Sequence, residues 1–160
     1  MKTILTPIDF SDVSEAVVRQ AAELAVALEA RIVLLAIVQP PVITSEYAPL
    51  MAENLSQITA VGEQNAERQL AHFRASLSAQ GIESKSVQLF GSPILIISEQ
   101  AVKFRADYIV MGSHGHGALY DLIVGSTTHG VLLRAKCPVM IVPAPKQKKG
   151  AAPKRKPKKP

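Results

Sequence analysis

Short apolar runs alternate with longer stretches of helical periodicity along this chain. Five runs built from aliphatic and β-branched residues predict strands. They cover Lys2–Ile8, Arg31–Val38, Ser84–Phe90, Tyr108–Met111 and Pro138–Val142. A helical repeat separates each run from the next, so the predicted order is four strand–helix units followed by a fifth strand.

The predicted helices carry apolar residues spaced three or four positions apart. In chain order the stripes are Val17, Ala21, Leu24, Ala25 and Leu28; Ala66, Leu70, Phe73 and Leu77; Ile94, Ile97, Ala101 and Phe104; and Thr128, Val131, Leu132 and Ala135. Ser11 or Ser14 is the expected N-cap of the first helix, because a serine hydroxyl can accept a bond from a backbone N–H of the first turn. Gly81 is placed to end the second helix, and Pro93 to open the third.

Strict alternation of strands and helices is typical of a parallel sheet, because each parallel connection must cross over one face. The predicted fold is therefore α/β: a single doubly wound, Rossmann-like, five-stranded parallel sheet with helices on both faces. Such sheets bind ligands beyond the carboxyl ends of their strands. Functional residues are expected just after Ile8, Val38, Phe90 and Met111.

The stretch from residue 112 to residue 130 is rich in glycine. Gly112 and Gly115 follow a predicted strand, and Gly125, Ser126 and Thr127 open a predicted helix. Glycine lets backbone N–H groups approach a ligand without an intervening Cβ, and the first N–H groups of a helix favour anions. The two hydroxyls add polar groups at the same place, so this stretch predicts a phosphate-binding loop.

The spacing excludes two common phosphate loops. No GK[ST] follows the glycines, which excludes a Walker A loop, and no third glycine completes the dinucleotide fingerprint after Gly115 and Gly117. Residues 112–127 also contain no Lys or Arg. Phosphoryl transfer needs positive charge on the developing oxyanions, so we expect at most slow hydrolysis and assign no catalytic residue.

The glycine spacing resembles that of a known family. The pattern Gly112-x2-Gly115-x9-Gly125-Ser126, the opening ILTPIDFSDVSEAV, the second-strand segment IVLLAIV and the closing CPVMIVP are together similar to the universal stress protein family. The resemblance covers residues 1 to about 144 and is to the ATP-binding branch. It implies ATP as ligand, Mg²⁺ bridging phosphate oxygens, and a homodimer paired through the strand Pro138–Val142.

The resemblance also implies which residues meet the nucleotide. Pro7 and Asp9 would contact the adenosine, with Asp9 near the ribose, and Ile37 and Met111 would pack on adenine. The residues implied along the phosphates are Gly112, Ser113, His114, Gly115, Gly125, Ser126 and Thr127. No protein side chain is assigned to a metal, and Mg²⁺ is expected through the ATP phosphates.

Several of these residues have a second interpretation. Asp9 is also suited to capping the first helix. Ile37 and Met111 are also ordinary core positions. His114 and His116 form a pair typical of some metal sites, but no third ligand is placed by the sequence, and phosphate contact or solvation is the preferred interpretation.

The net charge divides unequally along the chain. The 160 residues hold 18 Lys and Arg against 13 Asp and Glu, a net charge of +5, but eight of the basic residues lie within 146–160. The rest of the chain is left at −3, with ten basic residues against 13 acidic ones. Residues 145–160 lack large apolar side chains and are predicted to be a disordered basic tail, following a domain at 1–144.

The composition narrows the functional classes. A single cysteine, Cys137, excludes an intramolecular disulfide, and the absence of a signal-like segment or a membrane-length apolar run predicts a cytoplasmic protein. The leading hypothesis is an ATP-binding stress or regulatory protein. The alternative is a dimeric interaction protein that works without nucleotide. The basic tail is expected either to make weak contact with nucleic acid or an anionic surface, or only to keep the protein soluble.

Overall fold

The computed structural model describes residues 1–38, 48–113 and 124–144. The predicted tail at 145–160 and two candidate site residues, His114 and Gly115, lie outside the described residues. Five strands and four helices alternate as the sequence predicts. They are β1 (Lys2–Ile8), α1 (Ser14–Leu28), β2 (Ala30–Val38), α2 (Ala48–Ala79), β3 (Ser84–Phe90), α3 (Pro93–Lys103), β4 (Tyr108–Gly112), α4 (Ser126–Leu132) and β5 (Val139–Val142).

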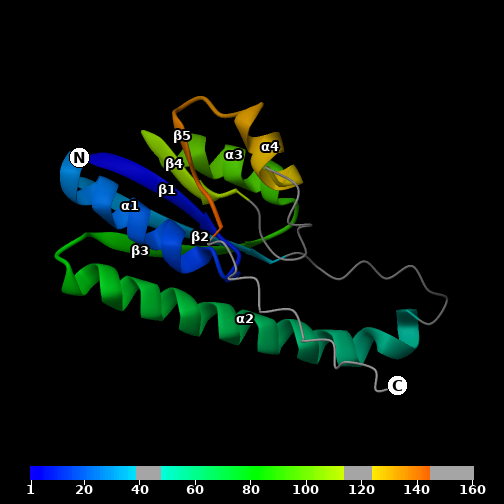
Figure 1. Cartoon of the computed structure of the whole chain (residues 1–160). Coiled ribbons are helices and arrows are strands. Elements are labelled where there is room, and N and C mark those ends of the chain that lie inside the picture. The colour runs from blue at the N-terminus through cyan, green and yellow to red at the C-terminus, as the bar shows by residue number, and fades with distance from the viewer. Residues whose placement is uncertain (39–47, 114–123, 145–160) are drawn as a thin grey trace, which may run out of the picture.

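The strands form one parallel sheet in the order β3-β2-β1-β4-β5 (Figure 1). The predicted α/β class with a five-stranded parallel sheet is confirmed. Strand β1 lies at the centre, with β2 on one side and β4 on the other. Because the chain moves outward in both directions from β1, the connections on its two sides cross opposite faces of the sheet.

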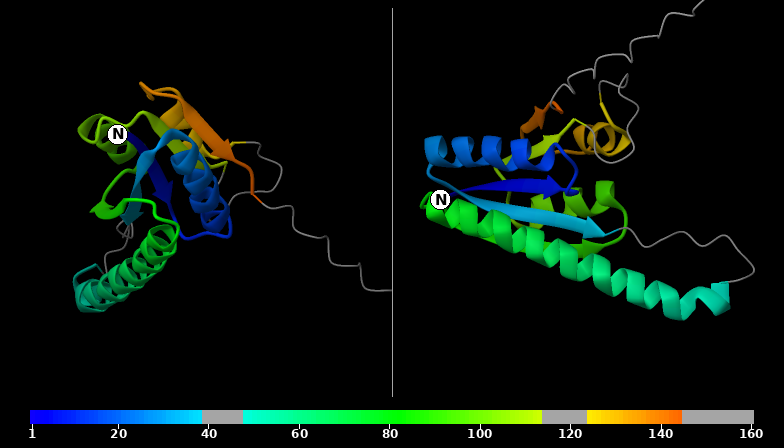
Figure 2. Two further views of the ribbon diagram at one scale, coloured as in Figure 1. Left: turned by 90° about the vertical axis from the view of Figure 1, so that its left-hand side faces the viewer. Right: turned by 60° about the horizontal axis from the view of Figure 1, so that its bottom comes forward.

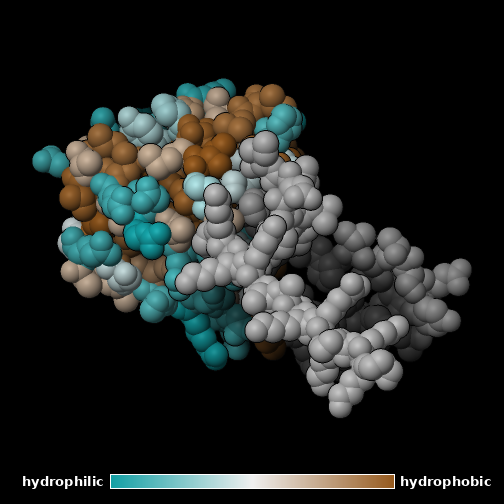
Figure 3. Space-filling model, in the orientation of Figure 1, coloured by the Kyte–Doolittle hydropathy of each residue, from teal (hydrophilic) through white to brown (hydrophobic). Residues whose placement is uncertain are grey.

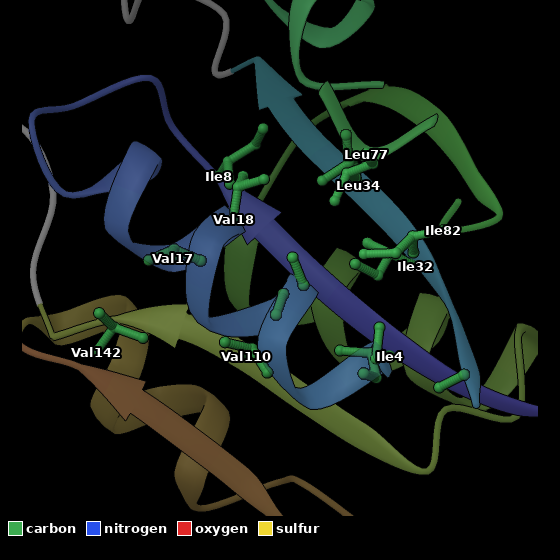
Figure 4. Close-up of a cluster of buried hydrophobic side chains, with 14 of the residues drawn as sticks. Ile4, Ile8, Val17, Val18, Ile32, Leu34, Leu77, Ile82, Val110 and Val142 are labelled. Carbon is green, nitrogen blue, oxygen red and sulfur yellow. The ribbon is translucent and has the colours of Figure 1, made fainter. Parts of the chain in front are cut away.

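Two apolar cores follow from the alternation of side chains along the strands. On β2, Ile32 and Leu34 point to the face covered by α1 and α2, whereas Val33 and Leu35 point to the face covered by α3 and α4. Figure 4 shows the first core, in which Leu77 of α2 and Val17 and Val18 of α1 converge on the central strands. Figure 2 (left) shows the sheet between α3 on one side and α1 and α2 on the other.

The ends of the helices agree only in part with the expected capping. The structure has Val13 as the N-cap of α1, and no side chain caps it, so the expectation of Ser11 or Ser14 is wrong. Both serine hydroxyls instead donate to the Asp9 carboxylate. After α2, the N–H of Gly81 (φ 73°) donates to Ser78 and that of Ile82 to Leu77, so the predicted glycine stop is confirmed as a Schellman motif.

The third helix starts as expected, with Ser92 as its N-cap and Pro93 in its first turn. Helix α4 is shorter than its predicted stripe. It ends at Leu132, which is 41% exposed, and Ala135 lies beyond it. Thr128 and Val131 are the residues of that stripe that α4 buries.

Helix α2 is longer than the strands it covers. Its 32 residues span about 48 Å, whereas the nine residues of β2 span about 30 Å. Within residues 60–79, the part of α2 whose burial the structure describes, Ala66, Leu70 and Leu77 are buried. The start of the helix runs past the carboxyl end of the sheet (Figure 2). Among the described helices, none is both long enough and apolar enough to cross a membrane.

Candidate functional site

The carboxyl ends of β1 and β4 lie next to each other where the connections change faces. Leu5 pairs with Ile109, and continuing that register places Ile8 level with Gly112. The chain leaves β1 towards α1 on one face, and α4, which follows β4, lies on the other face. This is the position at which doubly wound sheets bind ligands.

Two backbone hydrogen bonds join three segments at this edge. The Ser113 N–H donates to the Val142 carbonyl over 2.8 Å, and the Gly125 N–H donates to the Ser113 carbonyl over 2.7 Å. Gly125 is the N-cap of α4, so the second bond places the first turn of α4 directly beyond β4. The predicted opening of a helix at Gly125, beside the end of the fourth strand, is confirmed.

A third hydrogen bond comes from Thr128, for which the sequence predicts only a place in a helical stripe. The Thr128 hydroxyl donates to the Gly112 carbonyl over 2.8 Å. Thr128 is only 3% exposed, so this bond is shielded from water. A buried threonine among apolar helix positions is the signal that could have identified it, since such a hydroxyl needs a partner.

Three candidate adenosine contacts, Pro7, Ile37 and Met111, share one face of the sheet. Met111 belongs to the core beneath α3 and α4, and Ile37 packs against that core. Pro7 lies two positions beyond Leu5 on β1, so it points to the same face. Strand β1 lies between β2 and β4, which sets Pro7 between the other two. Pro7 and Met111 are buried, whereas Ile37 is half-buried and offers accessible apolar surface.

Asp9 follows β1 directly and organises the turn into α1. Its Oδ1 accepts bonds from the Ser11 N–H at 3.1 Å, the Ser11 hydroxyl at 2.6 Å and the Ser14 hydroxyl at 3.3 Å. Phe10 next to it has a φ of 61°, a left-handed conformation that costs free energy in a non-glycine residue. Asp9 is exposed, so its carboxylate is held in place yet open to solvent at the strand end.

The candidate phosphate residues open α4. Ser126 is exposed and Thr127 is half-buried, and both lie in the first turn of the helix. The first N–H groups of a helix have no partner within the helix and carry the positive end of its dipole. Ser113 is 6% exposed, and its backbone N–H and carbonyl are both engaged with the protein, so this candidate contact serves to join β4 to β5 and α4.

The described residues offer few other groups for metal binding or nucleophilic chemistry. No group of three or more His, Cys, Asp or Glu side chains able to hold a metal occurs in residues 1–38, 48–113 and 124–144. Burial, and next the Asp107 carboxylate, raise the pKa of the Cys137 thiol, which therefore stays protonated at neutral pH. Cys137 packs against the core under α3 and α4, as expected of a small apolar residue.

A hollow of about 480 Å³ lies on the opposite face, between the start of α1 and helix α2. Its lining includes Asp12, Glu15, Arg68 and His72, so both signs of charge face it. Pro7, Ile37 and Met111 face away from this hollow, towards α3 and α4. The hollow is therefore separate from the candidate nucleotide contacts.

Comparison with known proteins agrees with this fold. The universal stress protein MJ0531 of Methanocaldococcus jannaschii is 30% identical over 147 residues, covering 91% of this chain and 84% of that protein. The solved structure of the protein MJ0577 from the same organism superposes with a TM-score of 0.75 at 24% identity, covering 89% of this chain and 95% of the other.

Two further solved structures hold nucleotides. A universal stress protein in complex with cAMP has a TM-score of 0.62 at 23% identity, covering 90% of this chain and 98% of the other. The universal stress protein from Archaeoglobus fulgidus in complex with dAMP has a TM-score of 0.58 at 21% identity, covering 88% of this chain and 96% of the other. The model of the Universal stress protein family matches residues 1–143, and the chain belongs to that family.

Proposed function

We propose that this protein is a cytoplasmic, nucleotide-dependent regulator of the stress response that binds ATP between the ends of β1 and β4. The observation that carries the proposal is the pair of bonds to Gly112 and Ser113 that fixes the start of α4 beside the end of β4. That arrangement sets an anion-favouring helix start next to an apolar wall and a carboxylate. The nucleotides held by two structural neighbours support the choice of ligand class.

The adenosine half of the ligand would use the sheet side of the site. Ile37 offers apolar surface for one face of adenine. Pro7 and Met111 lie on the neighbouring strands β1 and β4 and point to the same face of the sheet. The Asp9 carboxylate, held by the two serines of its turn, is suited to accept hydrogen bonds from ribose hydroxyls. A preorganised acceptor loses little conformational freedom on binding, which favours affinity.

The phosphate half would use the start of α4. The Ser126 and Thr127 hydroxyls and the first N–H groups of the helix favour phosphate oxygens, and His114 and Gly115 are proposed to contribute from outside the described residues. Mg²⁺ prefers oxygen ligands and keeps several waters, which fits a site whose described donors are hydroxyls and a carboxylate. When bound, the ion would neutralise part of the phosphate charge.

Turnover is proposed to be slow. Residues 112–127 contain no Lys or Arg to stabilise the charge that develops during phosphoryl transfer. Asp9 Oδ1 already accepts three hydrogen bonds, so it is better placed to orient a ribose than to activate water. The nucleotide therefore acts as a bound signal, and binding itself is the property to measure.

Asp9→Ala should weaken ATP binding at least tenfold in isothermal titration calorimetry. A hydrogen bond to a charged group contributes about 1.5–3 kcal/mol, and the substitution also removes the acceptor that organises Ser11 and Ser14. Asp12→Ala is the matched control, because Asp12 is an exposed carboxylate in the same turn that faces the opposite hollow. Wild-type protein that takes up no adenine nucleotide at millimolar concentration would refute the proposal.

A second property concerns assembly: we propose a homodimer paired through β5. The two edge strands of the sheet differ in character. Strand β5 exposes Met140 by 36%, and Leu132 and Leu133, at the end of α4, are 41% and 71% exposed. Figure 3 shows apolar surface on the side of the molecule where β5 and α4 lie. Strand β3 carries the exposed Lys85, and a lysine on an edge strand opposes pairing. A partner strand against β5 would cover the apolar edge.

Met140→Lys should weaken the dimer more than tenfold in sedimentation equilibrium, because the change places a charge in the paired edge. Val102→Lys is the control, since Val102 is 61% exposed on α3 and is remote from β5 in sequence. As monomers, both variants should unfold at the same temperature as the wild-type monomer. A wild-type protein that sediments as a monomer at tens of micromolar would contradict the pairing.

A further inference from the structure

The hollow between the start of α1 and helix α2 has the size of a small-molecule site. Its volume of about 480 Å³ lies within the range of ligand pockets, about 300–1,000 Å³. Two of its lining side chains, Phe10 and Phe73, are aromatic, and both also pack against the first core. The ring of His72, another lining residue, lies tilted beside Phe73, with 6.0 Å between the ring centres. The hollow therefore offers aromatic surface to the apolar part of a ligand.

Charges of opposite sign line the two walls of this hollow. Asp12 and Glu15, three residues apart where α1 begins, supply carboxylates on one wall, and Arg68 of α2 supplies a guanidinium on the other. Within the part of the chain that the structure describes, no ion pair joins the two walls, so their charged atoms lie more than 4.0 Å apart. A ligand with a single charge would be attracted by one wall and repelled by the other.

Both walls are held in place by contacts outside the hollow. On the α1 wall, the hydroxyls of the lining residues Ser11 and Ser14 donate to Oδ1 of Asp9. On the α2 wall, Leu70 is buried in the first core, which fixes the helix turn that carries Arg68. A ligand that enters between fixed walls does not have to order them, and this favours its affinity.

The separation of the charges indicates the length of the ligand. In a single amino acid the ammonium and the carboxylate are attached to the same carbon, which is too short a connection to serve both walls. An extended dipeptide spans about 7 Å, and its free ammonium and free carboxylate lie at opposite ends. A side chain of such a peptide projects from between the two charged ends. A dipeptide therefore matches both the charges and the aromatic surface of the hollow.

We propose that this hollow binds a free dipeptide with an apolar side chain. The ammonium of the peptide faces Asp12 and Glu15, its carboxylate faces Arg68, and its side chain packs against Phe10 and Phe73. Ion pairs at exposed positions are individually weak, so the expected dissociation constant is of the order of millimolar. The site lies on the face of the sheet opposite the candidate adenosine contacts, so this inference does not depend on the proposed nucleotide site.

The test is a titration with alanyl-phenylalanine, followed by the amide chemical shifts of the full chain in NMR spectra. Three related probes each lack one feature of this peptide. Its N-acetyl form lacks the ammonium, its carboxyl-terminal amide lacks the carboxylate, and diglycine lacks the apolar side chains. The shifts should be largest at residues 10–15 and 68–73, and each related probe should bind about fivefold more weakly than alanyl-phenylalanine.

Two variants assign the charges to the two ends of the peptide. Arg68→Gln should bind alanyl-phenylalanine about fivefold more weakly and should no longer distinguish it from the amide. Asp12→Asn combined with Glu15→Gln should cause a similar loss and should abolish the preference over the N-acetyl form. Arg74→Gln is the matched control and should bind as the wild type does, because Arg74 is exposed on the same helix but lines a different hollow.

The replaced side chains are all exposed, so each variant should keep the wild-type stability in urea denaturation. The absence of saturable shifts at residues 10–15 and 68–73, at tens of millimolar alanyl-phenylalanine, would overturn the inference. Equal affinity of the wild type for all four probes would also overturn it, and so would probe preferences that survive in both variants. Shifts confined to the ends of β1 and β4 would place the peptide at the nucleotide site and would equally contradict the inference.

Discussion

Gly130→Val should lower the free energy of unfolding by about 3 kcal/mol in urea denaturation, because helix α4 has no room for a side chain at this position. A Cβ on Gly130 would lie 2.5 Å from Cδ1 and 2.9 Å from Cγ1 of Ile94 on α3. Rotation about χ2 can move Cδ1 of Ile94 away, but Cγ1 moves only with χ1, which is restricted in a β-branched residue of a helix. The two helices would be pushed apart at Gly130, about one turn after the candidate site residues that open α4.

Two further variants separate this packing effect from the helix propensity of glycine. Gly62→Ala on α2 has nothing within 4 Å of the new Cβ and should stabilise the protein by about 0.5–1 kcal/mol. Ile94→Ala should restore part of the stability when added to Gly130→Val, since it removes the clashing atoms. Equal stability of Gly130→Val and wild type would show that α4 is not held against α3 as the structure has it.

Thr128→Val should weaken ATP binding about tenfold and also lower the free energy of unfolding by about 1–3 kcal/mol. Valine has nearly the shape of threonine but cannot donate to the Gly112 carbonyl, which would lose this partner at the end of β4. The start of α4 would then lose one of the bonds that fix it to the end of β4. Because Ser126 and Thr127 precede Thr128 directly, their position relative to the strand would change with it.

Thr128→Ser is the conservative variant for this bond. Serine keeps the hydroxyl donor and loses only a methyl group, so nucleotide affinity should return to within about twofold of wild type. Calorimetry measures the affinity, and urea denaturation measures the stability of each variant. A loss of affinity in the serine variant, with wild-type affinity in the valine variant, would mean that packing by the methyl group, and not the hydrogen bond, positions the helix.

The strands and helices could be predicted because each one carries its own periodic signal. The runs Lys2–Ile8 and Ser84–Phe90 coincide with β1 and β3 residue for residue, and the stripe ending at Leu77 matches the buried side of α2. The predicted N-cap of α1, Ser11 or Ser14, is wrong for a local reason. Asp9 competes for the hydroxyls of Ser11 and Ser14, which therefore turn away from the helix start.

The bonds that assemble the site could not be predicted in the same way. The contact from Thr128 to Gly112 and the bond from Ser113 to Val142 join positions 16 and 29 residues apart, and no periodic pattern encodes such pairs. The order β3-β2-β1-β4-β5 decides which strand ends meet, and it depends on packing across the whole sheet. The glycine spacing located the loop, but the partners of its backbone emerged only from the fold.

The contrast between the two sheet edges limits how large an assembly can become. On β3, the Lys85 ammonium lies 3.9 Å from the centre of the Phe104 ring, which keeps a positive charge at that edge and its stem over an aromatic surface. A protein with two adhesive edges can add copies without end and form fibres, whereas one adhesive edge meeting its own copy gives a closed pair with twofold symmetry. In the proposed β5 dimer, growth by edge pairing would therefore terminate at two copies, which would protect the chain from aggregation when its concentration rises.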